Sequence, residues 1–258
     1  MTARRTSALL GGMLVAAASM SGRAQDAPQA RTLAMDSARI QPVYRTYDMI
    51  IHRADSATVI GQSVVALMPA SHAGADAWRL VETRSGAVRA ADSLWFALDG
   101  RPLSWSSTVG PAQLTAQFVG DSIFGAATAG RARNDIVMEG HPDLLVTGAF
   151  TSVMLGWLPL SESWSDSVTV LEIDLAKASV IPAEMIVAAM EELLVDAVTP
   201  RPAWVVALRT AQRQSLFWVD RETGVVLRIQ ENLPSHIGTM LEYRIHPIPR
   251  LRLPRYWP

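Results

Sequence analysis

The sequence predicts a mainly β protein whose strands form an antiparallel sheet. From residue 44 onward, short β-prone runs alternate with turn residues at intervals of about 8 to 12 positions. Several connections have only two to five residues, and loops of that length can join only antiparallel neighbours. The glycine-rich loops that hold phosphates in parallel nucleotide-binding sheets are absent from the sequence. These three observations favour a meander of strands over a parallel sheet.

Residues 1–24 have the pattern of a cleavable export signal. Arg4 and Arg5 precede a mostly apolar run at 8–20, and small residues lead up to Ala24, after which we expect cleavage. The apolar run is shorter than the roughly 20 residues that a membrane-spanning helix needs, and no later run reaches that length. We therefore expect a periplasmic or secreted protein without a transmembrane helix.

The rest of the chain divides into three parts by composition. Residues 25–41 show no clear hydrophobic period and predict a spacer. Residues 42–245 contain the strand-forming runs and predict a single domain. Residues 246–258 contain four prolines, which exclude a helix or a central strand and predict an extended tail.

Thirteen segments of this domain are predicted strands: 47–53, 58–68, 77–84, 93–98, 103–108, 113–119, 122–128, 133–138, 167–172, 204–210, 215–220, 225–231 and 239–245. Gly120-Asp121 joins two of these runs tightly, and the 220–224 loop ends in Gly224, where a left-handed residue is expected. The run 204–208 is apolar at every position, so a helix, another sheet or a bound apolar molecule must cover its second face.

Two further segments have helical features. Residues 143–157 carry apolar side chains at roughly helical spacing before Pro159 ends the run. Residues 183–194 are rich in good helix formers. In the same segment, however, Met185, Val187 and Ala189 fit a period of two residues, which indicates a strand.

The predicted domain also contains short phrases in a characteristic order. They are the strand pair at 47–53 and 61–67, Trp78, Asp92-Ser93-Leu94-Trp95, Arg101-Pro102-Leu103, the hairpin 118–125, Leu158-Pro159-Leu160 with Trp164, and then 203–206, 217–220, Thr223-Gly224 and 226–228. Taken together, they resemble an uncharacterised family of bacterial envelope β-proteins related to the lipoprotein-carrier (LolA-like) superfamily. The resemblance extends over roughly residues 42–245.

This resemblance implies an open, strongly curved antiparallel sheet, a half-barrel, with one short helical plug on its concave side. Residues 143–157 are the natural candidate for the plug. In the family, the region of 183–194 looks like a strand pair that leads to Trp204, and we therefore predict strand there. Pro200 and Pro202 depart from the glycine-centred turn expected before Trp204, which leaves the local register open.

Composition excludes several classes of function. The chain has 23 basic and 24 acidic residues, and its formal net charge of -1 gives no general attraction for nucleic acid. It has no cysteine, which excludes disulfides, thiolate metal sites, cysteine nucleophiles and an acyl-cysteine anchor. Lys177 is the sole lysine, which removes most lysine-nucleophile chemistry.

No sequence motif points to catalysis or to a cofactor. The five histidines are scattered without metal-ligand spacing, and the Gly-x-Ser-x-Gly motif of serine hydrolases is absent. Glu191 and Glu192 are adjacent, so in a strand they point to opposite faces and cannot act as a carboxylate pair. We expect no metal, no cofactor and no enzymatic activity; a hydrolase without a recognisable motif stays open as a third hypothesis.

The eight tryptophans are the unusual feature of the composition. Core packing is their ordinary role, and lining a cavity in the concave face is the alternative. The candidate ligand-binding residues for that alternative are Trp95, Trp105, Phe118, Phe124, Trp157 and Trp218. The first functional hypothesis is an exported half-barrel that binds an apolar small molecule, a lipid or a lipidated partner. The second is a structural or partner-binding envelope protein whose concave face is filled by the plug.

Overall fold

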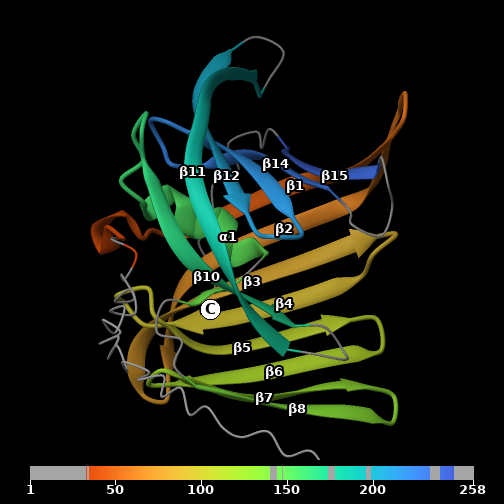
Figure 1. Cartoon of the computed structure of the whole chain (residues 1–258), viewed down its shortest axis with the longest axis vertical. Helices are drawn as coiled ribbons and strands as arrows, with labels where there is room; N and C mark the ends of the chain where they lie inside the picture. Colours follow the sequence, from red (N-terminus) through yellow and green to blue (C-terminus); the bar gives the residue numbers. More distant parts are fainter. Residues whose placement is uncertain are drawn as a thin grey trace, which may run out of the picture. The chain divides into compact units, whose positions relative to one another are not determined.

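The computed structural model describes residue 33 and residues 35–139, 144–146, 148–173, 178–195, 199–232 and 239–246. The predicted export signal and residues 247–258 of the predicted tail lie outside these ranges. Within these ranges, fifteen strands form one sheet in the order β8-β7-β6-β5-β4-β3-β2-β1-β15-β14-β13-β12-β11-β10-β9 (Figure 1). All neighbouring pairs are antiparallel except β9 and β10, which are parallel. The sheet is open, because β8 and β9 stand at its two ends.

The first half of the sheet consists of β1 (Val43–Arg53), β2 (Ser56–His72), β3 (Ala75–Gly86), β4 (Ala90–Phe96), β5 (Pro102–Val109), β6 (Ala112–Val119), β7 (Ser122–Ala129) and β8 (Ala132–Met138). The second half consists of β9 (Leu144–Val146), β10 (Ser165–Ile173), β11 (Ala178–Leu194), β12 (Pro200–Arg209), β13 (Gln214–Asp220), β14 (Val226–Asn232) and β15 (Thr239–Ile245). All thirteen predicted strands are present, with ends that differ by a few residues.

The strand prediction for 183–194 is confirmed, because this segment belongs to β11. Hydrogen bonds to β10 on one side and β12 on the other hold it extended, with an irregular register between Val187 and Ala189. Its helix formers do not decide the outcome, since pairing with neighbouring strands outweighs intrinsic propensity.

The predicted helix at 143–157 is shorter than expected. Residues 144–146 form β9, and the helical part consists of α1 (Ala149–Met154) followed by the 3-10 helix η2 (Leu155–Trp157). Gly148, just before α1, has a φ of 86°. Glycine adopts this conformation without strain, which lets the chain turn from strand into helix. Asp143 lies outside the described residues.

The segment 149–157 plugs the concave side of the sheet. Phe150 and Trp157 contact Phe96 of β4 at ring-centroid distances of 5.5 and 5.6 Å, and all three side chains belong to the main core. At Gly156 the plug lies so close to the β13–β14 turn that a Cβ would stand 2.4 Å from the carbonyl oxygen of Gly224. Gly224 has the left-handed conformation predicted from the sequence, with a φ of 69°.

The two ends of the sheet also contact each other. Leu171 of β10 and Val180 of β11 pack against Leu114, Ile123 and Ile136, which belong to β6, β7 and β8. Figure 1 shows β10 and β11 crossing in front of the strands of the first half. The sheet is therefore strongly curved, as the resemblance implied, and its concave side is partly enclosed.

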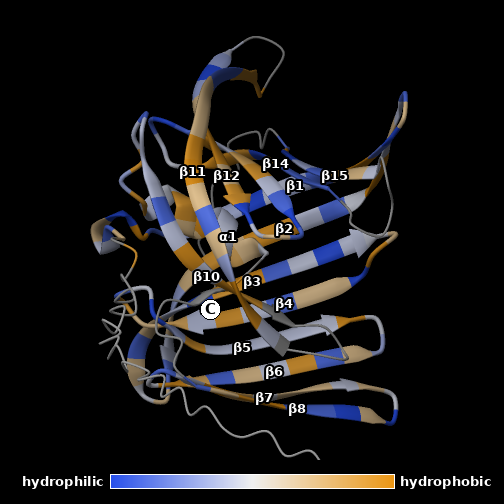
Figure 2. Cartoon of the chain, viewed as in Figure 1, coloured by the Kyte–Doolittle hydropathy of each residue, from blue (hydrophilic) through white to orange (hydrophobic). Residues whose placement is uncertain are grey.

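A second apolar cluster covers the convex face of β12 and β13. Val206 and Leu208 point into the main core, whereas Val205 and Trp218 belong to a separate cluster that the end of β11 covers. Figure 2 shows the apolar character of β12. Both faces of 204–208 are covered, as predicted, but the second face is covered by the end of β11 in the same sheet and not by a helix, another sheet or a bound molecule. Glu191 of β11 accepts a hydrogen bond from Trp218 Nε1 at 2.8 Å.

The end of the predicted spacer takes part in the fold. Leu33 and Met35 pack against the main core and Ile40 is buried in it. The backbone N–H of Asp36 donates to the carbonyl oxygen of Trp157 at 2.9 Å, and the 3-10 helix η1 (Ser37–Arg39) follows. The packed domain therefore starts before residue 42. In the described part of the chain, no helix is long and apolar enough to span a membrane.

Replacing Phe96 by alanine tests the contact between plug and sheet. Phe96 is fully buried between Phe150 and Trp157, so Phe96→Ala should lower the free energy of unfolding by about 3–5 kcal/mol. Phe124→Ala is the matched control, because the Phe124 side chain is 45% exposed, and it should cost less than about 1 kcal/mol. Urea denaturation followed by tryptophan fluorescence measures both. Equal losses in the two variants would contradict the assigned packing.

Candidate ligand-binding cavity

A cavity of about 770 Å³ lies on the concave side of the sheet, beside the plug. Side chains from both halves of the sheet line it, together with Ala149, Phe150 and Ser152 of α1. The plug therefore fills only part of the space that the curved sheet encloses.

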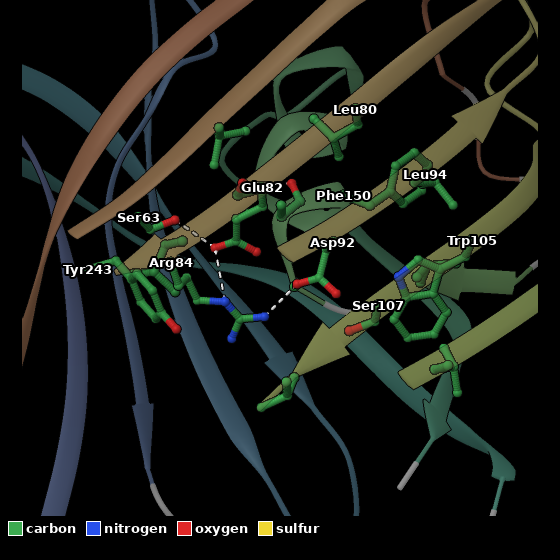
Figure 3. A pocket seen from close by; sticks show the side chains of 18 of the residues that line it. Ser63, Leu80, Glu82, Arg84, Asp92, Leu94, Trp105, Ser107, Phe150 and Tyr243 are labelled. Carbon is green, nitrogen blue, oxygen red and sulfur yellow. Dashed lines mark hydrogen bonds and ion pairs between the residues drawn. The ribbon is translucent and has the colours of Figure 1, made fainter. Parts of the chain in front are cut away.

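The strand register arranges the cavity wall in two parallel rows. Leu80, Leu94 and Trp105 lie opposite one another across β3, β4 and β5. Glu82, Asp92 and Ser107 form a second row, in which each residue lies two positions from its counterpart in the first row on the same strand. Residues two positions apart on a strand share a face, so both rows face the cavity. Figure 3 shows this arrangement. An apolar row thus runs directly beside a polar one.

Arg84 connects the two acidic residues of the polar row. Glu82 and Asp92 are opposite each other on β3 and β4, a position in which like charges repel. The Arg84 Nη2 atom lies 2.5 Å from Asp92 Oδ2, and its Nε lies 3.7 Å from Glu82 Oε1. The Ser63 hydroxyl donates to Glu82 Oε1 at 2.6 Å. The arginine charge and the serine hydrogen bond offset the repulsion.

Burial changes the acidity of the groups around this row. Burial raises the pKa of Glu82, and the charge of Arg84 only partly opposes the shift. Burial likewise raises the pKa of Glu231 against the opposing charges of Arg213 and Arg84. Burial and the nearby Glu231 and Glu82 raise the pKa of Tyr243, which keeps its hydroxyl protonated. Burial acts to lower the pKa of Arg84, but Glu82, Tyr243 and Asp92 outweigh it, so the guanidinium stays charged.

Among the described residues of this group, one buried polar side-chain atom has no hydrogen-bond partner. The Nε–H of Arg84 is buried without a hydrogen-bond acceptor, since the 3.7 Å separation from Glu82 Oε1 is too long for a hydrogen bond. A buried donor without an acceptor costs about 1–3 kcal/mol. The cavity wall therefore contains a buried polar group whose hydrogen-bonding capacity the protein leaves unused.

The six aromatic residues predicted from the sequence do not gather in one place. Trp105 lines the cavity, and Phe118 packs against the core clusters beside it. Trp157 is part of the plug and is buried, with 3% of its surface exposed, and it does not line this cavity among the described residues. Trp95 and Phe124 each follow an inward-facing residue, which turns both to the convex face. Trp218 also points to the convex face, where it belongs to the separate apolar cluster.

The sequence reasoning did not single out the charged residues of the cavity. A usable signal exists on β3, where Leu80, Glu82 and Arg84 alternate along the strand and so share one face. Charged residues on the same face as a core leucine indicate a polar group inside the domain. Glu231 and Tyr243 carry no such local signal, because only the pairing of β14 with β15 and of β15 with β1 brings them to this wall.

Comparisons with known proteins identify a similar fold. The β-barrel-like protein of the domain of unknown function DUF1849 from Brucella abortus matches with a TM-score of 0.50 and 12% sequence identity, over 81% of this chain and 97% of that chain. The hypothetical lipoprotein YmcC from Escherichia coli gives a TM-score of 0.34 and 14% identity, over 80% of this chain and 89% of that one. No protein-family model and no curated protein sequence matches the chain. At such low identity the first similarity supports the fold alone.

The pH dependence of stability tests the buried carboxyl groups. Glu82 and Glu231 have raised pKa values in the folded protein, compared with an ordinary value of 4.5. Above pH 4.5 the folded state therefore binds more protons than the unfolded state, and stability falls as the pH rises through the raised values. Glu82→Gln removes one of these groups but keeps an acceptor for Ser63. The stability advantage of this variant over the wild type should therefore increase as the pH rises above 4.5.

Urea denaturation at a series of pH values measures this difference. Glu184→Gln is the control, because Glu184 is exposed on β11, and its stability should run parallel to that of the wild type. If Glu82→Gln also runs parallel to the wild type, Glu82 does not hold its proton in the folded state.

Proposed function

We propose that this protein is an exported, non-enzymatic half-barrel that binds the apolar part of a lipid, a lipidated partner or another apolar molecule. The observation that carries the proposal is the cavity of about 770 Å³ in the concave face. Its volume falls within the roughly 300–1,000 Å³ typical of sites for small molecules. Its apolar row would contact hydrocarbon, and its polar row would contact a head group or linkage.

The polar row supports a ligand with an oxygen or nitrogen acceptor next to its apolar part. The Ser107 hydroxyl lines the cavity on the same face as Trp105 and can donate a hydrogen bond to such an acceptor. Glu82, Asp92 and Arg84 already neutralise one another in part. A free anionic group alone would therefore gain little there.

The alternatives have less support from these contacts. A concave face filled by the plug would leave no room for a ligand, yet a cavity remains beside Phe150. A serine hydrolase most often uses a histidine base to activate its nucleophile, and the described lining residues include no histidine. An envelope location rests on the export-signal pattern of residues 1–24 and on the resemblance to the LolA-like superfamily, both read from the sequence.

A tryptophan placed in the cavity tests the proposal. Ser107 lines the cavity, so Ser107→Trp should fill it and weaken binding of the neutral apolar dye Nile red about tenfold or more. Dye fluorescence titration gives the dissociation constants, and native mass spectrometry of the purified protein shows whether lipid co-purifies with the wild type and is lost in the variant.

The neighbouring residue provides the matched control. Ser106 is exposed on the opposite face of the same strand, and Ser106→Trp should leave dye binding and co-purified lipid unchanged. A wild-type protein that carries no lipid and binds no dye would overturn the proposal. Equal binding by the two folded variants would place the bound molecule elsewhere.

A further inference from the structure

A second cavity, of about 730 Å³, lies on the other side of the plug. Its walls come from residues 38–45, from Val153, Leu155 and Trp157 of the plug, and from the β13–β14 turn at 220–225. Phe150 and Ser152 face the first cavity, so the plug separates the two. The second cavity shares no lining residue with the first and is independent of the proposed function.

Three arginines from three separate segments line this cavity: Arg39 of η1, Arg45 of β1 and Arg221 of the β13–β14 turn. Arg39 is paired with Asp36 at 3.2 Å. Arg221 stacks over the ring of Trp204, with its guanidinium carbon 4.4 Å from the ring centroid. Within the described residues, neither Arg45 nor Arg221 forms an ion pair with a carboxylate.

The buried acid in the wall is not available to these arginines. Asp220 is buried, and its Oδ1 atom accepts hydrogen bonds from the backbone N–H groups of Glu222 and Thr223 at 2.9 and 2.8 Å. Its Oδ2 atom lies 3.6 Å from Arg201 Nη1. These contacts fix the turn and occupy the carboxylate. Glu222, the other acidic residue of the lining, is exposed.

Arg45 has hydrogen-bonding capacity that the protein does not use. Burial raises the pKa of Tyr47, and the charge of the nearby Arg45 acts against that shift; the Tyr47 hydroxyl donates to the carbonyl oxygen of Val226 at 3.0 Å. The Nη1 atom of Arg45 is buried without any acceptor. Buried donors in this state are rare in folded proteins, and a guanidinium without a carboxylate partner has a charge left to neutralise.

We propose that the second cavity binds an oxyanion, a carboxylate or phosphate group, held by Arg45 and Arg221. A planar guanidinium matches both groups through paired N–H donors, and such charge-assisted bonds are stronger than neutral ones. The bound oxyanion supplies the negative charge that neither arginine finds among the described carboxylates of the protein. Trp204 holds the Arg221 guanidinium in a fixed plane beside the cavity.

Binding of inorganic phosphate and of malonate to the purified full chain tests this site. Isothermal titration calorimetry in a chloride buffer of constant ionic strength excludes general screening as the cause of any signal. We expect saturable, one-site binding of at least one of the two anions; which of them binds identifies the phosphate or the carboxylate as the recognised group. Arg221→Gln and Arg45→Gln should each weaken it about tenfold or more, because each removes a charge-assisted contact.

Two control variants separate binding at this site from a general charge effect and from binding in the first cavity. Arg133→Gln removes an equal charge at a side chain that is 66% exposed on β8, and it should bind the anion like the wild type. Ser107→Trp, which fills the first cavity, should also bind it unchanged. Arg221 lies in an exposed turn, so we expect Arg221→Gln to fold. That variant therefore tests the site even if Arg45→Gln does not fold. Absence of binding by the wild type, or equal weakening by Arg133→Gln and Arg221→Gln, would overturn the proposal.

Discussion

The contact between the helical plug and the concave face of the sheet supports the rest of the structure. A curved antiparallel sheet with an apolar inner face is stable only when something covers that face. Phe150 and Trp157 cover it by packing against Phe96 of the first half of the sheet and against core residues of the second. A helical segment of nine residues would not be stable alone, so the plug and the sheet hold each other in place.

The plug also produces two cavities with different chemistry. On one side, the sheet presents an apolar row next to the Glu82–Arg84–Asp92 group. On the other side, Arg45 and Arg221 line a cavity whose buried carboxylate, Asp220, accepts hydrogen bonds from the backbone of the β13–β14 turn. Each wall contains a buried guanidinium nitrogen without a hydrogen-bond partner. A stable core pairs its buried polar atoms, and proteins depart from this rule most often at functional sites.

A further buried charged group, around Glu242, has a different electrostatic balance from the first cavity. Glu242 is fully buried on the convex face, where it accepts hydrogen bonds from Arg228 at 2.9 Å and from Arg244 at 2.8 Å and lies 3.1 Å from His52 Nε2. Burial acts to raise the pKa of Glu242, but the two arginines outweigh it and lower the pKa. The carboxylates in the first cavity show the opposite balance, because burial there exceeds the effect of the neighbouring charges.

Thirteen of the fifteen described strands and the left-handed Gly224 followed from the sequence alone, because residue alternation and turn chemistry act over a few residues. The tertiary structure decided which side chains share a wall. Trp218 points to the convex face, and Tyr243 lies in the same cavity wall as Glu82. Both placements depend on the register between strands that are far apart in the chain. The tertiary structure also converted 144–146 from predicted helix into strand, because β10 offers that segment a hydrogen-bonding partner that no local pattern reveals.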